Sequence, residues 1–276
     1  MEGPDVRWLD RQTEADRFRR PSDLRHRGAA PVQFGCQRVS GDAGPALPQR
    51  PRGLGLPGTS GGQPRRAASE VRPRGNPCCN RDPPCRCGLH GANDDAAGTT
   101  AMIILSKYFK KLNNNERTLI FAAFTAEEVG GFGAQYFSKQ FDPLTVKAMF
   151  NIEMIGTESK WGRNSAYITG YEKTDMGAIL QKNLAGSGFT FYPDPYTDQN
   201  LFYRSDNATL ARLGVPAHTI STSKMDSEPN YHKPSDEFQT LDMDNMNEII
   251  KAIAKSAQSI IAGKDTPSRV DTTQLK

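Results

Sequence analysis

The pattern of apolar and polar residues predicts several helices over residues 91–276. Apolar residues recur every three or four positions along 101–112, which is the spacing of a helix that buries one face. The same spacing over about 242–262 predicts a long closing helix. Weaker patterns predict three shorter helices, and the full set is 101–112, 132–139, 175–184, 205–213 and 242–262. Helices with one apolar face need a shared core against which to pack.

Short runs rich in apolar and β-branched residues lie between those helices and predict strands. The predicted strands are 117–124, 146–152, 165–170 and 215–221. Because strands alternate with helices along the chain, we expect an α/β fold, a three-layer sandwich with a mostly parallel sheet. The 186 residues from 91 to 276 are enough for one well-packed domain.

Composition changes sharply near residue 90 and divides the chain into two parts. Residues 1–90 hold 16 Arg and no Lys, Ile or Tyr, whereas residues 91–276 hold 5 Arg and 14 Lys. Frequent Pro and Gly and the lack of apolar periodicity predict that residues 1–90 are disordered. Two origins stay open for this part: a natural basic tail, or a GC-rich gene read out of frame. Because this part supplies the formal charge of +4, that charge does not indicate a nucleic-acid partner.

All five cysteines lie in the first part of the chain. Four of them, with one histidine, stand close together but lack the paired C-x2-C spacing of a structural zinc site. The residues concerned are Cys78, Cys79, Cys85, Cys87 and His90. We therefore do not expect a zinc knuckle there. No signal peptide is readable before residue 90, and no run reaches the ~18 apolar residues of a membrane span.

Candidate chemistry begins with two adjacent carboxylates, Glu127 and Glu128, which follow a predicted strand and precede two glycines. In α/β folds, functional side chains lie at the ends of strands. Neighbouring side chains of an extended segment point in opposite directions, so one carboxylate can bind a metal while the other faces a substrate water. The alternative is a charged loop on a solvated surface.

Three further metal-binding residue types lie in other segments of the second part. Asp94 is in a Gly-flanked turn, Glu153 follows a predicted strand, and His232 is in a polar loop. Carboxylates with an imidazole are the ligands that zinc accepts in hydrolytic sites. Taken one at a time, each residue has a simpler interpretation. Asp94 also fits a helix N-cap, Glu153 a surface carboxylate and His232 a histidine in a loop.

Five local motifs occur in an order that resembles the M28 family of zinc aminopeptidases. They are Gly-Ala-Asn-Asp-Asp-Ala-Ala-Gly, Thr-Ala-Glu-Glu-Val-Gly, Asn-Ile-Glu-Met-Ile-Gly, Arg-Ser-Asp-Asn and Tyr-His-Lys-Pro-Ser-Asp. The resemblance covers nearly all of 91–270 and none of 1–89. It implies the zinc-peptidase type of α/β sandwich (phosphorylase/hydrolase-like), a peptide substrate and two zinc ions. It also suggests an exported or periplasmic protein.

The resemblance also implies roles for the candidate residues. Asp94 would bridge two zinc ions, Glu128 and His232 would complete one zinc site, and Glu153 would belong to the other. Glu127 resembles the general base, which takes a proton from the attacking water and passes it to the leaving amine. These roles together describe hydrolysis of an N-terminal peptide bond.

Two more residues resemble functional residues of the family, and each has an alternative structural role. Tyr231 is similar to a tyrosine that stabilises the tetrahedral oxyanion in some members, or it packs within its loop. Arg204 resembles a substrate-contacting arginine, or it forms a structural ion pair.

One element of the family pattern is missing. Family members carry His-x-Asp on a strand upstream of the bridging aspartate, and no His-x-Asp occurs in this chain. We therefore expect one zinc ion to be held well, the early strands of the sheet to be missing, and little or no aminopeptidase activity. The Asp/Glu/His trio also resembles the single zinc site of glutaminyl cyclases, and an inactive binding remnant or a mis-translated fragment is a further alternative.

Overall fold

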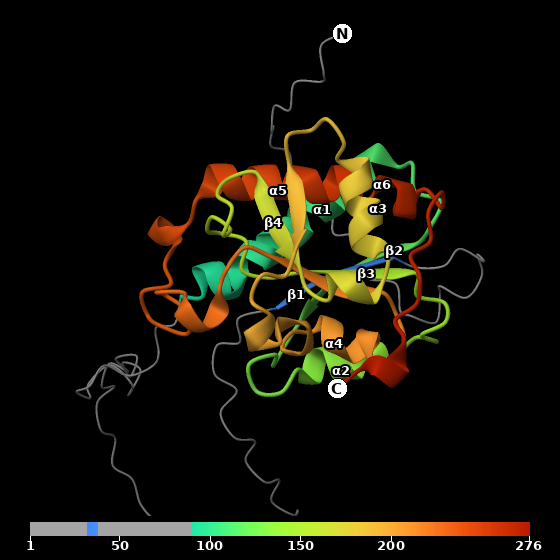
Figure 1. The fold of residues 1–276 in the computed structure, drawn as a ribbon, viewed down its shortest axis with the longest axis horizontal. Coiled ribbons are helices and arrows are strands. Elements are labelled where there is room, and N and C mark those ends of the chain that lie inside the picture. The colour runs from blue at the N-terminus through green and yellow to red at the C-terminus, as the bar shows by residue number, and fades with distance from the viewer. Residues whose placement is uncertain (1–31, 38–89) are drawn as a thin grey trace, which may run out of the picture.

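The computed structural model describes residues 32–37, as a backbone strand, and residues 90–276. Their centre is one six-stranded sheet (Figure 1). The strands are β1 (Val32–Gln37), β2 (Leu119–Phe124), β3 (Ala148–Ile152), β4 (Ser165–Ile168), β5 (Thr190–Pro193) and β6 (Ala217–Ser221). Their spatial order is β2-β1-β3-β6-β4-β5, and every neighbouring pair is parallel except β4 with β6. The predicted mostly parallel sheet is confirmed.

Helices cover both faces of the sheet and complete the predicted three layers (Figure 1). The helices α1, α3, α5 and α6 lie on one face, and α2 and α4 lie on the other. Their bounds are α1 (Ala97–Leu112), α2 (Phe132–Ser138), α3 (Met176–Asn183), α4 (Asn207–Ala211), α5 (Met243–Ser256) and α6 (Gln258–Ile261). The single closing helix predicted over 242–262 is therefore two helices that meet at Ala257.

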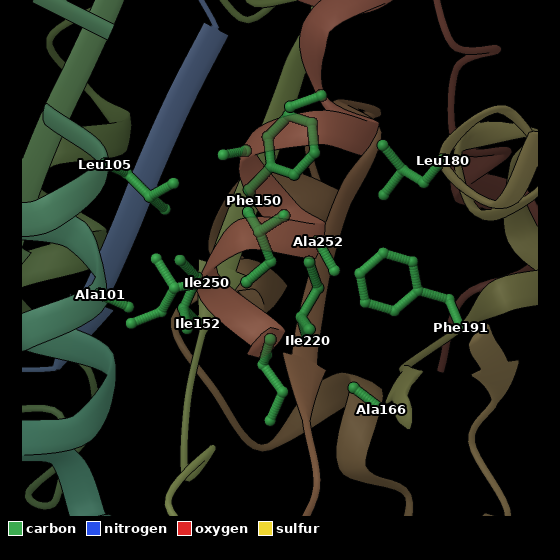
Figure 2. Close-up of a cluster of buried hydrophobic side chains, with 14 of the residues drawn as sticks. Ala101, Leu105, Phe150, Ile152, Ala166, Leu180, Phe191, Ile220, Ile250 and Ala252 are labelled. Carbon is green, nitrogen blue, oxygen red and sulfur yellow. The ribbon is translucent and has the colours of Figure 1, made fainter. Parts of the chain in front are cut away.

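Two of the three clusters of buried hydrophobic residues lie on opposite faces of the sheet, because the central strands bury side chains on both faces. Along β3, Phe150 belongs to the cluster under α1 and α5, while its neighbour Met149 belongs to the cluster under α2 and α4. Figure 2 shows Phe150 with Leu105 of α1 and Ile250 of α5 in the larger cluster. A strand buried on both faces reads as a nearly continuous apolar run, and β3 is apolar except at the buried Asn151.

The first part of the chain contributes a strand, which corrects one expectation. Val32–Gln37 lies between β2 and β3 and is parallel to both, so the prediction of disorder is wrong for these six residues. The sheet has thus kept a strand upstream of residue 90. Residues 1–31 and 38–89, with the cysteine-rich segment, lie outside the described residues.

The carboxyl ends of β1, β2 and β3 meet at one edge of the sheet because these three strands run parallel. Glu127 and Glu128 follow β2, and Glu153 follows β3 directly. The turn that carries Asp94 leads into α1, which packs on the same strands. The fold therefore gathers the candidate carboxylates at this edge. None of the helices in 90–276 has the length and apolarity required to cross a membrane.

Candidate metal centre

Asp94 lies in an irregular turn that precedes α1. The backbone of Asp94 is not helical, with φ −114° and ψ 89°, and the Asp94–Asp95 peptide bond is cis. The side chain of Asp236 accepts hydrogen bonds from the backbone N–H of Asn93 at 2.8 Å and of Asp94 at 3.0 Å. These bonds satisfy two backbone donors that no helix could satisfy at this position. Hydrogen bonds from the turn to Asp236 therefore attach the turn to the loop that contains this residue.

The same turn is also attached to the end of β3. Asp95 Oδ1 accepts hydrogen bonds from the N–H of Gly98 at 3.0 Å and of Met154 at 3.1 Å. Asn93 Oδ1 accepts from the N–H of Gly156 at 2.8 Å. Two polar side chains of one short segment thus attach the backbone on either side of Asp94 through three hydrogen bonds. The side chain of Asp94 itself is only 4% exposed.

Glu127 and Glu128 are presented by a tight turn after β2. The N–H groups of Gly130 and Gly131 both donate to the carbonyl of Glu127 at 2.9 Å. Gly130 has φ 122° and Gly131 has φ 64°, backbone conformations that glycine adopts without steric cost. The two glycines that follow the carboxylates are therefore the residues that this turn favours.

His232 brings the third candidate ligand to the other two. Its Nε2 lies 3.1 Å from Asp94 Oδ2 and 3.0 Å from Glu128 Oε2. One ligand atom from each of the three residues lies within 4.8 Å of the others. Three segments that are far apart in sequence thus meet at one point, as the sequence predicted.

The donor set fits zinc. Two carboxylates and one imidazole give three protein ligands and leave a position open, which is the arrangement of catalytic zinc sites. Asp94 Oδ1 is buried and has no hydrogen-bond partner among the described residues, so a cation would satisfy it.

Burial and mutual repulsion raise the pKa of several carboxyl groups here. Burial, followed by the charge of Glu128, raises the pKa of Asp94 to about 8. The same two causes raise the pKa of Glu127 to about 8. Burial, followed by the charge of Glu127, raises the pKa of Glu153 well above its ordinary value. Without a cation the site therefore holds protons, and binding a cation should release them.

A fourth buried carboxyl group, Asp206, lies beside this cluster. Burial, then the charge of Glu128, raises its pKa to about 7. Both of its carboxyl oxygens are buried without a hydrogen-bond partner within the described part of the chain. Asp206 therefore adds to the negative potential that favours a cation.

A model of peptidase family M28 matches residues 74–257. The chain belongs to peptidase family M28. Its curated relatives include a probable leucine aminopeptidase of Arthroderma benhamiae, 29% identical over 182 residues that cover 62% of this chain and 48% of the relative. This M28 chain thus spans about half the length of the curated relatives it matches.

Solved structures support the M28 fold. The aminopeptidase from Aneurinibacillus sp. strain AM-1 has a TM-score of 0.55 and 18% identity, covering 94% of this chain and 49% of its own. The zinc aminopeptidase BSAP from Bacillus subtilis has a TM-score of 0.58 and 15% identity, covering 91% of this chain and 48% of its own. Identities this low establish the fold alone.

Arg204 and Tyr231 lie together beside the M28 carboxylates. Arg204 Nη1 forms an ion pair with Asp226 at 3.0 Å, so the structural alternative predicted for Arg204 is present. Arg204 also forms a side-chain hydrogen bond with Tyr231, and its charge opposes the rise in the pKa of Glu127. The ring of Tyr231 stacks on that of His232 with 3.8 Å between ring centroids. Substrate contact by Arg204 and oxyanion stabilisation by Tyr231 stay predictions.

The M28 pattern departs from its usual form at the second metal position. The other histidines of residues 90–276 are elsewhere: His90 Nε2 lies 3.8 Å from Glu237 Oε1, and His218 bonds to Thr174 and Thr169. Strand β1 lies between the strands that lead to Glu127 and Glu153, but its sequence, Val-Gln-Phe-Gly-Cys-Gln, contains neither His nor Asp. The expected role of Glu153 as a ligand therefore lacks an imidazole partner within the described residues.

Sequence reasoning missed the residues that hold the candidate ligands in place. Asn93, Asp95 and Asp236 stand inside the motifs that indicated the family, but their hydrogen bonds join segments far apart in sequence. The available signal was the number of polar residues in each motif, which exceeds the number of metal ligands. Asp206 stands in the motif Arg-Ser-Asp-Asn, and the sequence alone indicates no role for it.

Proposed function

We propose that this chain is a zinc-dependent aminopeptidase that hydrolyses N-terminal peptide bonds with a water nucleophile. The observation that carries the proposal is the convergence of Asp94, Glu128 and His232 beside a further carboxylate, Glu127. Membership of peptidase family M28 and the named aminopeptidases among its relatives support it.

The residues divide the chemical work as follows. Asp94, Glu128 and His232 would hold zinc, which when bound supplies Lewis acidity to the scissile carbonyl and lowers the pKa of water. Glu127 would accept a proton from the attacking water and deliver it to the leaving amine. A cation next to Glu127 favours the ionised form of its carboxyl group. Because a base must be ionised to accept a proton, metal binding would prepare Glu127 for this role.

The charge around the site supports the choice of an amino-terminal substrate. A bound cation favours the ionised forms of Glu127, Glu153 and Asp206, which then place negative charge in a largely buried region. A positively charged amino terminus is attracted to such a region, whereas a carboxyl terminus is repelled. Arg204 would contact the substrate from the rim while Tyr231 donates a hydrogen bond to the oxyanion.

We propose that one zinc ion is bound tightly and a second only weakly. Asp94 and Glu153 alone are two carboxylates without an imidazole, a donor set that favours harder cations over zinc. A single ion would leave the enzyme slow, because the second ion and its histidine are part of the family pattern.

The test is zinc content of the purified chain together with hydrolysis of leucyl peptides, before and after chelation. We expect about one tightly bound zinc per chain and slow release of the N-terminal residue that chelation abolishes and zinc restores. Absence of zinc, or a rate unaffected by chelation, would contradict the proposal. Cyclisation of glutaminyl peptides in place of hydrolysis would support the glutaminyl-cyclase alternative.

A further inference from the structure

Asp236 connects two of the three segments that carry the candidate metal ligands. It lies four residues after His232, and its carboxylate accepts hydrogen bonds from the backbone N–H groups of Asn93 and Asp94. Its backbone carbonyl accepts a third hydrogen bond, from the N–H of Ala92 at 3.1 Å. Three consecutive N–H groups of the Asp94 turn therefore end on one residue of the His232 loop.

The side chain of Asp236 is buried, and both of its carboxylate oxygens accept a hydrogen bond. Asp236 is 3% exposed, and each of its two oxygens accepts one of the two side-chain bonds. Hydrogen bonds from backbone N–H groups to a carboxylate are among the shorter and stronger ones in proteins. A buried group of this kind holds its partners in one geometry, because breaking either bond leaves a buried donor unsatisfied.

We propose that Asp236 is a positioning residue that couples the Asp94 turn to the His232 loop and so sets the affinity of the zinc site. The proposal rests on the proposed zinc site. Asp94 Oδ2 and His232 Nε2 lie 3.1 Å apart, and any drift of the turn relative to the loop changes that separation. Outer residues that orient metal ligands typically contribute 10–100-fold to metal affinity.

Two substitutions at this position separate geometry from charge. Asp236→Asn keeps the shape of the side chain but offers one accepting oxygen for two N–H donors. Asp236→Glu keeps the charge and both oxygens but moves them by one methylene in a buried site. Glu237→Gln is the matched control, because Glu237 is the next residue in the loop, has a half-exposed side chain and loses the same charge.

The experiment measures the zinc dissociation constant of each variant by competition with a chelator of known affinity. We expect Asp236→Asn and Asp236→Glu each to weaken zinc binding by about 10–100-fold, and Glu237→Gln to bind zinc as the parent chain does. Parent-like binding by Asp236→Asn would overturn the proposal. Full recovery of affinity in Asp236→Glu would also overturn it, because charge alone would then suffice.

A second measurement uses the unaltered chain and does not depend on the variants folding. In metal-free protein, the amide hydrogens of Asn93 and Asp94 should exchange with solvent much more slowly than those of an exposed turn, because Asp236 accepts both. Rapid exchange of these two amide hydrogens would overturn the proposal that Asp236 holds the Asp94 turn. Neither readout needs peptidase activity, so a chain that binds zinc without hydrolysing peptides would disprove the proposed function and leave this inference standing.

Discussion

Glu127 and Glu128 are neighbours in one turn, yet the structure gives them different surroundings. Glu128 lies 3.0 Å from the ring nitrogen of His232, whereas Glu127 is outside that three-residue cluster. We predict that Glu127→Gln keeps its zinc and loses about 10²–10⁴-fold in turnover, because it removes only the proton acceptor. Glu128→Gln is the matched control and should lose zinc. Metal analysis with rate measurement checks both, and zinc loss from Glu127→Gln would argue against its role as base.

Asp206 should make the metal-free protein less stable as pH rises. Its pKa is about 7 in the folded chain against an ordinary 3.8, so between these values the folded state binds more protons than the unfolded chain. The stabilisation is present at acidic pH and is lost as pH rises through 7. We predict that Asp206→Asn flattens the fall in free energy of unfolding across this window, measured by denaturant titration without metal. An unchanged slope would show that Asp206 does not hold this proton.

At the residue level, the sequence indicated the candidate ligands but not the residues that support them. Asp94, Glu128 and His232 stand in motifs that resemble the family, and the structure brings them together. Asp236 could not be identified as a support, because its role depends on backbone donors that come within reach only after folding. The ion pair of Arg204 with Asp226 likewise depends on two loops meeting.

At the level of elements, periodicity predicted the long helices and the buried strands, but not two of the strands. Helix α1 and strand β3 have clear apolar patterns, and each was expected within a few residues of its bounds. Strand β5 is only four residues long and ends at Pro193. The sequence of β1 alternates Val32, Phe34 and Cys36 with other residues, but frequent Arg, Pro and Gly in the surrounding segments hid this short pattern.

The contact between α1 and β3 depends on a glycine in the first turn of the helix. A Cβ at Gly98 would overlap the carbonyl oxygen of Ile152 and the carboxylate of Asp95. We predict that Gly98→Ala lowers the free energy of unfolding by about 1–3 kcal/mol, because overpacking against backbone outweighs the gain in helix propensity. Thr100→Ala, on the exposed side of the same helix, should be nearly neutral. Denaturant unfolding of both checks this, and a stabilised Gly98→Ala would contradict the close contact.

At the level of the whole molecule, the position of β1 suggests how to add the missing ligand. Its carboxyl end pairs Gln37 with Phe124, next to the turn that carries Glu127 and Glu128. We predict that a histidine at one of the two last positions of β1 raises bound zinc from about one to about two per chain and speeds hydrolysis. Adjacent residues of a strand face opposite sides, so Cys36→His and Gln37→His serve as controls for each other. One zinc in both variants would contradict this placement.

Zinc at this site would also change how fast the fold is lost. Asp94, Glu128 and His232 meet only after distant parts of the chain have assembled, and contacts between distant segments tend to form late in folding. Interactions absent from the folding transition state slow unfolding and leave the folding rate nearly unchanged. We therefore expect zinc to lengthen the lifetime of the folded chain in denaturant without accelerating refolding, as stopped-flow fluorescence would measure. Bound zinc would then slow the loss of the fold as well as take part in the proposed chemistry.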